Sequence, residues 1–527
     1  MMGLLVHELL TNNLHKNRDN TLLKEKGSSI THGDLEKKSN KFCNYLEKLG
    51  VKKNDRVAII ADSSINAVIA LMGIMKRGAI FVPINVNNAL SNTDFILQET
   101  EATLLIIDER LQERVHDFKY IKENNIPVII NGKANVSHCH CFDDYMEYDS
   151  IITNKQKIIS KDVVYIIFTS GTTGKPKGVM INHESICSFM TYVVDKFQHN
   201  ADTRTLSKTP LSFDPYLTEI VPSFIGGGTV YLYKELVSIR NFLKVLQDEK
   251  ITNFGCGPSL LLLLAENKTV FKEYDLSSLE QIYFGYENCP INTIVTLQLE
   301  LPSVSFINGY GTTETYASST FHIVDKLEGT EPENIPLGEP IKGTELMILN
   351  SNLQLTKHGE VGELVIRGNT LMNGYWKNEE ETNRVLRYNP LFPNSLEKVY
   401  FTGDYVRMDK NNNILFVGRK DEQVKIQGYR VELSEIQNCI ETHNVVKECC
   451  VITVEEELNK RMVCYLRTAN NSEEELLEVR GFSINALEAY KIPSEWFLID
   501  DMPRNLNSKV DKRELKNIYY NNKIITN

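Results

Sequence analysis

The chain has 527 residues, of which 42% are hydrophobic and 24% are charged, and its formal net charge is −11. This composition is typical of globular proteins, and the length suggests about three or four structural units. The acidic balance disfavours nucleic-acid and anionic-membrane binding, which need a basic surface, and no charge-free run reaches the ~20 residues that a membrane-spanning helix needs.

The first 150 residues alternate between helical and strand patterns. Apolar residues recur with helical spacing over residues 34–49 and 65–75, which predicts two helices. Short apolar runs between them predict strands, and this alternation is typical of a parallel sheet covered by helices. The predicted strands lie at residues 57–60, 79–83, 104–108 and 127–131.

The same pattern recurs from residue 163 to about residue 307, after a polar stretch at 153–161 where we expect a boundary. Just before it, His138-Cys139-His140-Cys141 has the composition of a metal site. Adjacent residues of a strand point to opposite faces and no partner motif follows, so ordinary loop or core residues are favoured over metal ligands.

From about residue 335 the pattern changes to alternating β segments, such as residues 362–368 and 413–418. The charged run Gly418-Arg419-Lys420-Asp421 then interrupts the alternation, and a shorter α+β pattern follows to the end. The last ~105 residues therefore read as a small unit joined to a large one, and its position suggests a lid.

Targeting and redox features favour the cytoplasm. The N-terminus, MMGLLVHELL, has no cationic leader and no small-residue cleavage site, which argues against a signal peptide. The ten cysteines are dispersed rather than arranged as a disulfide framework. We therefore expect a cytoplasmic protein with neither nucleic-acid nor membrane partners.

The most informative segment is a buried strand that runs into a loop of hydroxyls, glycines and lysines, Thr169-Ser170-Gly171-Thr172-Thr173-Gly174-Lys175-Pro176-Lys177-Gly178. Glycines allow close approach of the backbone, and hydroxyls with N–H groups can surround phosphate oxygens. The loop lacks the GxxxxGK[ST] pattern of a Walker loop. A surface loop is the alternative, but the composition favours phosphate binding.

The segment FTSGTTGKPKGV (168–179) resembles the signature of the adenylate-forming superfamily, which comprises acyl-CoA synthetases, luciferases and nonribosomal-peptide adenylation domains. Five further segments resemble motifs of that superfamily in the same order, so the resemblance covers nearly the whole chain. They are KRGAIFVP (76–83), NGYGTTE (308–314), YFTGD (400–404), GRKDEQVKI (418–426) and NSKVD (507–511).

The resemblance implies an α/β fold with a large N-terminal core of layered sheets and helices at 1–418. It implies a small mobile α+β C-terminal lid at 419–527, which turns about Asp421 and carries the catalytic Lys509. Gly428 is implied to lie in a loop beside the thiolation channel. The chain departs from the usual motifs at Ser508 and Gln427, where Gly and Arg are common.

The resemblance also implies an ATP site, and each matched residue suits it chemically. Tyr310 offers an aromatic face to adenine and the Asn308 amide can pair with its edge. Asp404 can accept hydrogen bonds from ribose hydroxyls, and the planar guanidinium of Arg419 can hold ribose or phosphate oxygens. The residues implied to bind ATP or AMP are Thr169, Ser170, Gly171, Thr172, Thr173, Lys177, Gly285, Tyr286, Glu287, Asn308, Gly309, Tyr310, Gly311, Thr313, Asp404, Phe416, Arg419 and Lys509.

Magnesium and a catalytic cation complete the implied site. Glu314 and the hydroxyls of Thr172 and Thr173 are hard oxygen ligands that suit Mg²⁺ and its phosphates. Lys509 would place a positive charge between the substrate carboxylate and the α-phosphate, where negative charge accumulates. An isolated lysine such as Lys509 is more often a solvated surface residue than a catalytic one. Only its place in the ordered set of motifs favours the catalytic role.

The segment Phe213-Asp214-Pro215-Tyr216 resembles the FDxS segment of amino-acid-activating members, in which the Asp binds the substrate ammonium. A cation that enters an apolar pocket must find an anion, because an unpaired buried charge is too costly. Here Tyr216 replaces the usual Ser, and a helix-capping Asp is the alternative. We favour recognition of an ammonium group.

The other positions that would line the substrate pocket carry no charge, which favours a small or medium uncharged amino acid. Proline is the first candidate, followed by alanine and glycine, while Thr218 and Ser318 keep serine and asparagine open. The positions matched by motif are Pro215, Thr218, Gly255, Ile282, Phe284, Gly309, Ala317 and Ser318, which join Phe213 and Asp214.

The chain stops 18 residues after Lys509 and contains no HHxxxDG motif, so we expect a freestanding monomeric enzyme that serves a separate phosphopantetheine carrier protein. It resembles prolyl- and D-alanyl-carrier protein ligases. Two alternatives stay open, an acyl- or aryl-CoA synthetase that uses free CoA, and a non-enzymatic nucleotide or amino-acid sensor. Asp214 argues against the first, while Lys509 and Glu314 argue against the second.

Overall fold

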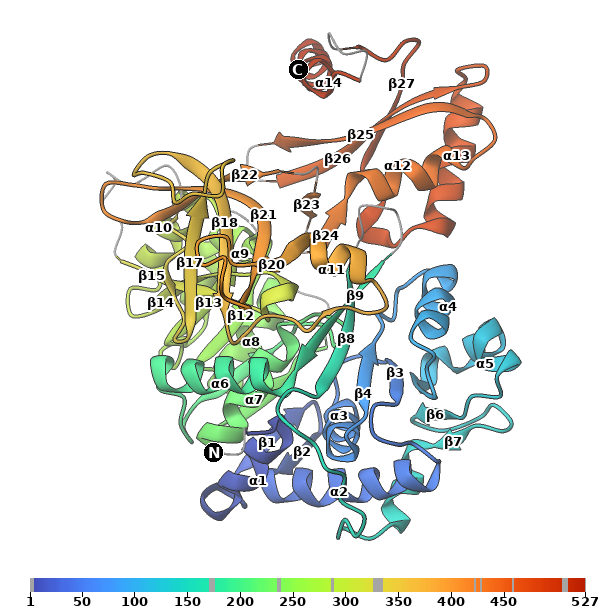
Figure 1. Ribbon diagram of the computed structural model, residues 1–527, viewed down its shortest axis with the longest axis vertical. Coiled ribbons are helices and arrows are strands. Elements are labelled where there is room, and N and C mark those ends of the chain that lie inside the picture. The colour runs from blue at the N-terminus through green and yellow to red at the C-terminus, as the bar shows by residue number, and fades with distance from the viewer. Residues whose placement is uncertain are drawn as a thin grey trace. The chain divides into compact units, whose positions relative to one another are not determined.

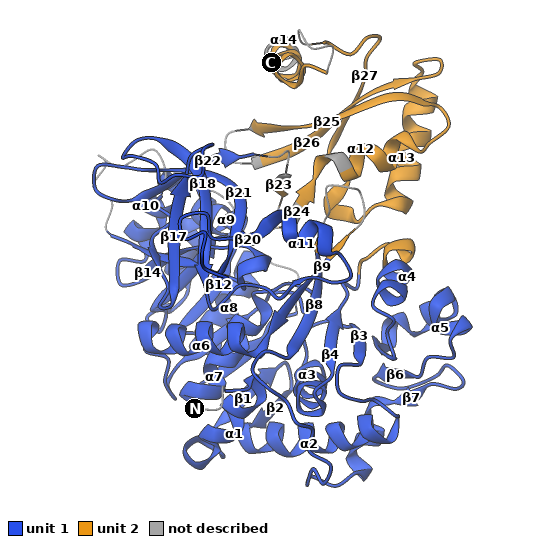
Figure 2. Cartoon of the chain, in the orientation of Figure 1, with its two compact units in different colours: residues 1–86, 93–168, 178–420 blue, residues 87–92, 169–177, 421–527 orange. Residues whose placement is uncertain are grey.

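The structure is a computed structural model, and its described residues fall into two compact units (Figures 1 and 2). Unit 1 comprises residues 1–86, 93–168 and 178–420, and unit 2 comprises residues 87–92, 169–177 and 421–527. The roles predicted for a core at 1–418 and a lid at 419–527 stay predictions. The structure describes residues 4–169, 176–234, 238–285, 289–325, 335–420, 423–426, 429–456, 459–504 and 510–526.

The first layer of unit 1 is an eight-stranded, mainly parallel sheet with the order β19-β9-β8-β4-β3-β5-β6-β7. Its central strands are continuous apolar runs, as expected for strands that are buried on both faces. The strands are β3 (Arg56–Ile60), β4 (Ile80–Pro83), β5 (Leu104–Asp108), β6 (Val128–Asn131), β7 (His140–Cys141), β8 (Val163–Thr169), β9 (Lys177–Asn182) and β19 (Gly374–Tyr375).

The boundary predicted at residues 153–161 is wrong. Phe81 of β4 pairs in parallel with Tyr165 of β8, so one sheet includes strands from both sides of that stretch. A polar connection between two strands of one sheet has the same composition as a linker between domains, and composition alone does not separate the two cases.

The second layer is a nine-stranded sheet that separates two hydrophobic cores. Ile282 and Phe284 of its central strand lie in one core, while Tyr283 packs against the other, because successive side chains of a strand point to opposite faces. In sheet order the strands are β16 (Glu339–Pro340), β15 (Thr320–Val324), β14 (Ser305–Tyr310), β13 (Gln281–Gly285), β12 (Asn253–Cys256), β10 (Arg204–Ser207), β11 (Thr229–Leu232), β1 (Thr21–Glu25) and β2 (Ser28–Thr31).

Helices cover both large sheets, and the two helices predicted near the N-terminus are confirmed as α2 and α3. Almost every residue of α3 is buried, since its sequence is apolar on all sides. None of the described helices combines the length and the apolar character that crossing a bilayer requires. Before residue 420 the α-helices are α1 (Val6–Asn17), α2 (His32–Lys48), α3 (Ile65–Arg77), α4 (Leu90–Glu99), α5 (Lys119–Glu123), α6 (His183–Phe197), α7 (Tyr216–Gly226), α8 (Ile239–Asp248), α9 (Pro258–Glu266), α10 (Ile291–Glu300) and α11 (Glu379–Val385).

A five-stranded antiparallel sheet completes unit 1, at the place where alternating β segments are predicted. Its longest strand, β21, pairs with β22, and this register sets Asp404 directly opposite Arg419. The predicted α/β fold class is thereby confirmed. The strands are β17 (Thr344–Leu349), β18 (Val361–Gly368), β20 (Leu386–Tyr388), β21 (Lys398–Met408) and β22 (Ile414–Arg419).

Unit 2 contains a three-stranded sheet with a separate hydrophobic core on each face. Cys449 and Val451 lie in the core that α12 and α13 cover, while Cys450 and Ile452 lie in the core that α14 covers. This alternation follows the two-residue period of a strand. The elements are β23 (Gln423–Ile426), β24 (Tyr429–Glu432), α12 (Leu433–Glu441), β25 (Val446–Glu456), β26 (Asn459–Thr468), α13 (Glu473–Ala486), β27 (Glu495–Leu498) and α14 (Lys512–Thr526).

A buried lysine joins two elements of unit 2. The ammonium of Lys491 lies 2.6 Å from a carboxylate oxygen of Glu435 on α12 and 2.9 Å from one of Glu488. Burial alone lowers the pKa of Lys491, but Tyr490, Glu435 and Glu488 more than offset this effect and hold the pKa above its ordinary value. The ammonium therefore stays charged and is shared between two buried carboxyl groups.

Substitution of Lys491 by Met should destabilise unit 2, because it leaves Glu435 and Glu488 buried without their cation. Removal of one partner from a buried ion pair typically costs ~3–5 kcal/mol. The free energy of unfolding of unit 2, measured by native-state hydrogen exchange, should fall by about that amount. Lys460→Met, which breaks the exposed pair with Glu455, is the control and should change it by less than ~1 kcal/mol. Equal effects of the two variants would contradict this role.

Candidate functional site

The site is built where three parallel strands of the nine-stranded sheet end together. Gly285 at the end of β13 pairs with Gly309 near the end of β14. A Cβ atom on Gly285 would lie 2.1 Å from the carbonyl oxygen of Gly309, a separation that no side chain tolerates. Gly285, one of the predicted nucleotide-binding residues, is therefore a glycine because the two strand ends approach so closely.

The loop that follows β14 folds back on itself. The Ser319 N–H donates to the carbonyl oxygen of Tyr310 over 2.7 Å, and a Cβ atom on Gly311 would lie 1.9 Å from the carbonyl oxygen of Ala317. Tyr316 and Ala317 have φ angles of 52° and 60°, and such left-handed conformations cost of order 1–3 kcal/mol at residues other than glycine.

Burial of Tyr316 and Glu314 holds this strained loop in place. The Tyr316 side chain is fully buried, and its ring packs edge-on against Phe189 with the centroids 5.4 Å apart. Glu314 is fully buried as well, and its carboxylate accepts a hydrogen bond of 2.7 Å from the Tyr375 hydroxyl. The backbone carbonyl of Glu314 accepts a further bond from the Met372 N–H.

Glu314 is the one residue predicted to hold magnesium that lies among the described residues. Its carboxylate is a hard oxygen donor of the kind that Mg²⁺ prefers, so this part of the site fits the ion. Thr172 and Thr173, the other predicted donors, lie outside the described residues. Within the described part of the chain, no group of three or more His, Cys, Asp or Glu residues could hold a metal ion.

Asp404 lies at the centre of a hydrogen-bonded group in the predicted nucleotide site. Its carboxylate accepts from the Tyr310 hydroxyl over 2.5 Å and pairs with the Arg419 guanidinium over 2.5 Å. Burial, and then the negative charge of Asp404, raise the pKa of Tyr310 well above its ordinary value, so the phenol stays protonated and donates. A carboxylate has about four acceptor positions, so two more donors, such as ribose hydroxyls, can still be accommodated.

Some of the remaining predicted nucleotide-binding residues lie among the described residues, and the others lie outside them. The Asn308 amide N–H donates to the carbonyl oxygen of Pro336 over 2.9 Å, which fixes the orientation of the amide, and Phe416 packs against the same core as Tyr310. Thr169 ends β8, Lys177 begins β9 and Thr313 begins a 3-10 turn. Lying outside the described residues are Ser170, Gly171, Thr172, Thr173, Tyr286, Glu287, Lys509, the predicted hinge Asp421 and the channel residue Gly428.

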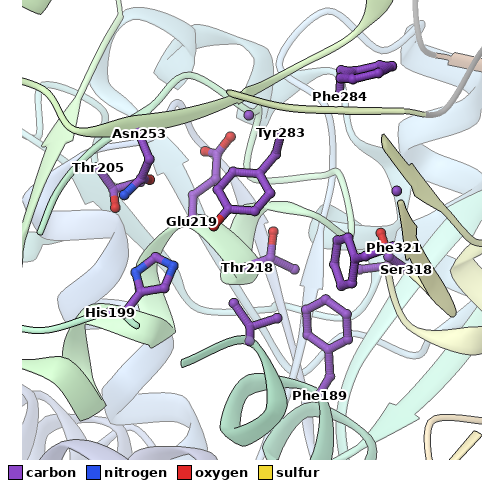
Figure 3. A pocket seen from close by; sticks show the side chains of 14 residues that line it. Phe189, His199, Thr205, Thr218, Glu219, Asn253, Tyr283, Phe284, Ser318 and Phe321 are labelled. Carbon is purple, nitrogen blue, oxygen red and sulfur yellow. The ribbon is translucent and has the colours of Figure 1, made fainter. Parts of the chain in front are cut away.

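A cavity within unit 1 opens beside the 308–319 segment (Figure 3). The empty space between its lining atoms is about 670 Å³, a figure that includes open solvent. Six of the predicted substrate-binding residues line it, and four do not. The lining residues are Phe189, Val193, His199, Thr205, Thr218, Glu219, Asn253, Gly255, Tyr283, Phe284, Gly309, Ala317, Ser318 and Phe321.

The predicted residues that do not line the cavity are Phe213, Asp214, Pro215 and Ile282. Ile282 is fully buried in a hydrophobic core and does not line the cavity, although Phe284, two residues further along β13, does. The N-cap residue of α7 is Pro215, so Asp214 does not occupy the capping position considered as its alternative role.

Asp214 lies close enough to Tyr316 to influence its ionisation. Burial is the main cause that raises the pKa of Tyr316 well above its ordinary value, and the negative charge of Asp214 is the next. Burial, and then the electrostatic effects of Tyr316 and Asp214, also raise the pKa of Tyr165 well above its ordinary value. Tyr316 directly precedes Ala317 and Ser318, which line the cavity, whereas Asp214 does not line it.

Motif matching missed four polar lining residues, His199, Thr205, Glu219 and Asn253. Glu219 accepts hydrogen bonds of 2.6 Å from Ser207 and from Thr209. Its burial raises the pKa of the carboxyl, and those two hydroxyls act in the opposite sense. A sequence signal existed for one of these residues, because Asn253 is the polar residue of an otherwise apolar strand, whereas β10, which contains Thr205, is mostly polar.

The sequence of the chain matches a family of known enzymes. The model of the AMP-binding enzyme family matches residues 10–376. The chain is 31% identical over 517 residues to a linear gramicidin synthase of Brevibacillus parabrevis, and the match covers 97% of the chain and 6% of that protein. The chain thus spans only a small part of that relative.

Two solved structures share the fold. The amide bond synthetase McbA from Marinactinospora thermotolerans superposes with a TM-score of 0.87 and 18% identity, over 98% of this chain and 100% of that one. The NRPS protein holo-PA1221, which contains adenylation and PCP domains, superposes with a TM-score of 0.81 and 20% identity, over 97% of this chain and 84% of that one. The family match extends over most of the chain, and the chain therefore belongs to the AMP-binding enzyme family, the adenylate-forming enzymes whose motifs it carries.

Proposed function

We propose that the chain activates an amino acid with ATP and transfers the aminoacyl group to the phosphopantetheine thiol of a separate carrier protein. One observation carries the proposal. The segment 308–319 contains predicted nucleotide-binding residues, including Tyr310 and Thr313, together with the cavity residues Gly309, Ala317 and Ser318. An acid bound in the cavity is therefore held next to the predicted nucleotide site.

In the first step, a carboxylate oxygen of the amino acid attacks the α-phosphorus of ATP. A new P–O bond forms, the bond from that phosphorus to the pyrophosphate oxygen breaks, and aminoacyl-AMP and pyrophosphate result. Asp404 orients the ribose, and Lys509 offsets the charge that develops between the reacting groups. Glu314 would be one of the ligands of Mg²⁺, and the ion would neutralise the negative charge of the ATP phosphates.

In the second step, the carrier thiolate attacks the acyl carbon of the mixed anhydride. The C–S bond forms, the bond from that carbon to the phosphate oxygen breaks, and AMP leaves. The resemblance to adenylate-forming enzymes supports a hinge at Asp421 that withdraws Lys509 and presents the Gly428 loop between the two steps. The likeness to a linear gramicidin synthase and to an NRPS protein with a PCP domain supports a carrier protein as acceptor.

The proposed substrate is an uncharged amino acid of small or medium size, and the enzyme is proposed to act in the cytoplasm as a monomer. The motif-matched positions rank proline first, then alanine and glycine. That ranking took no account of His199, Thr205, Glu219 or Asn253, which also line the cavity.

Amino-acid-dependent exchange of labelled pyrophosphate into ATP tests the proposal. A panel of the twenty amino acids and D-alanine, compared with a panel of fatty and aryl acids, should give exchange only with amino acids. Exchange supported by fatty or aryl acids, together with thioester formation on free CoA, would instead identify an acyl- or aryl-CoA synthetase.

Lys509→Ala should abolish pyrophosphate exchange, because the charge that develops in the first step loses its counterion. The same variant should still form the thioester when synthetic aminoacyl-AMP and carrier protein are supplied, since that step does not use Lys509. Lys516→Ala on α14 is the matched control and should retain both activities. Equal loss of both steps in Lys509→Ala would refute the assigned role.

Asp214→Ala should impair binding of amino acids selectively, because their ammonium group would lose its counterion in a largely buried site. The expected loss in kcat/KM for pyrophosphate exchange is about 100-fold or more. The KM for ATP, measured in the same assay, should change by less than about threefold. If the KM for ATP rises in parallel with the loss of kcat/KM, Asp214 acts on folding or on the nucleotide rather than on the ammonium.

A further inference from the structure

The cavity has a polar end formed by two neighbouring strands. Thr205 of β10 and Asn253 of β12 are direct partners in the parallel register, so their side chains point to the same face of the sheet. Both line the cavity, and Figure 3 draws them together on the side of the view opposite Phe321 and Ser318. This placement puts a hydroxyl and a carboxamide at one end of the cavity.

His199 adds an imidazole to this polar end. It follows the C-terminus of α6, and both of its ring nitrogens are buried without a hydrogen-bond partner among the described residues. Burial lowers its pKa to about 4, so the ring is neutral at physiological pH. A neutral imidazole carries one donor and one acceptor, and a buried polar group that lacks partners costs free energy. The ring is therefore prepared for a ligand that both donates and accepts.

Glu219 lies near these groups but is already engaged. One of its carboxylate oxygens accepts from Ser207, the other accepts from Thr209, and the Thr209 N–H donates as well. The other polar residues at this end, His199, Thr205 and Asn253, are neutral, and the Asn253 amide donates one hydrogen bond to the Thr252 hydroxyl over 3.3 Å. The polar end is thus suited to an uncharged hydrogen-bonding group and not to a cation.

The rest of the cavity wall is mainly apolar. Phe189, Val193 and Phe321 line it, and the Phe189 and Phe321 rings pack with their centroids 6.0 Å apart. A side chain that enters beside Ala317 and Ser318 therefore passes an apolar wall before it meets the polar end. Proline, alanine and glycine lack a side-chain group that could reach and bond with His199.

We propose that the cavity selects an amino acid with an uncharged side chain that ends in a hydroxyl, phenol or carboxamide, and that His199, Thr205 and Asn253 bind this terminal group. The inference rests on the proposed amino-acid adenylation and names its substrate class. It makes these three residues determinants of specificity, in addition to the positions matched by motif. It also reverses the ranking that placed proline first.

Pyrophosphate exchange with near-isosteric pairs tests this inference. The pairs are tyrosine and phenylalanine, threonine and valine, asparagine and leucine, and glutamine and methionine. In the unmodified enzyme, the polar member of at least one pair should exceed its apolar partner in kcat/KM by about tenfold or more, because a site built for hydrogen bonds rejects an analogue that lacks them.

His199→Leu should lower the ratio of kcat/KM for the polar member to kcat/KM for its apolar partner by about tenfold or more. His199→Gln, which keeps a donor and an acceptor, should retain part of the preference. His116→Leu, at an exposed histidine in a 3-10 helix, is the matched control and should leave it unchanged. If His199→Leu does not fold, Asn253→Val is measured in the same way with the same expectation.

Three results would overturn the inference. A preference for the apolar member of every pair, unchanged in His199→Leu, would mean that the polar end holds only water. A preference for lysine or ornithine would mean that the Glu219 carboxylate recognises a cation. Exchange supported by fatty or aryl acids and by no amino acid would overturn the proposed function together with this inference, and is distinguished by that substrate panel.

Discussion

The close approach of strand ends at Gly285, Gly309 and Gly311 is the constraint on which the rest of the site depends. At Gly285 and Gly311 an added Cβ atom would lie about 2 Å from a backbone carbonyl oxygen, so these positions exclude side chains. The crowding brings the carboxyl ends of β13 and β14 together and directs the following loop back across them. Ligands commonly bind at this edge of open parallel sheets.

The loop 311–319 contributes residues both to the predicted nucleotide site and to the cavity. Burial of Glu314 and Tyr316 holds the strained backbone, and the same few residues present Ala317 and Ser318 to the cavity. Asp404 and Arg419, which pair across an antiparallel sheet, meet the hydroxyl of Tyr310 from the end of β14. Elements from two sheets thus converge on one short segment, which lies between the proposed nucleotide site and the proposed site for the acid.

Local patterns in the sequence predicted the elements well and the cavity only in part. The strand expected at 104–108 is observed as β5 at the same residues, because a short apolar run between polar ends leaves little freedom. Motif matching identified Gly255 and Gly309, yet it placed Ile282 in the cavity although Ile282 is buried in a hydrophobic core and does not line it. His199 and Asn253 were missed because they lie outside every motif, and only the strand register and the end of α6 bring them to one wall.

The most direct test is a crystal structure with a non-hydrolysable aminoacyl-adenylate analogue of the amino acid that supports the fastest exchange. The account predicts the substrate ammonium within hydrogen-bond distance of Asp214 and the ribose hydroxyls at Asp404. It also predicts the side chain between Phe189 and Phe321, with its terminal group at His199 and Asn253. A side chain bound outside this cavity, or an ammonium remote from Asp214, would contradict it.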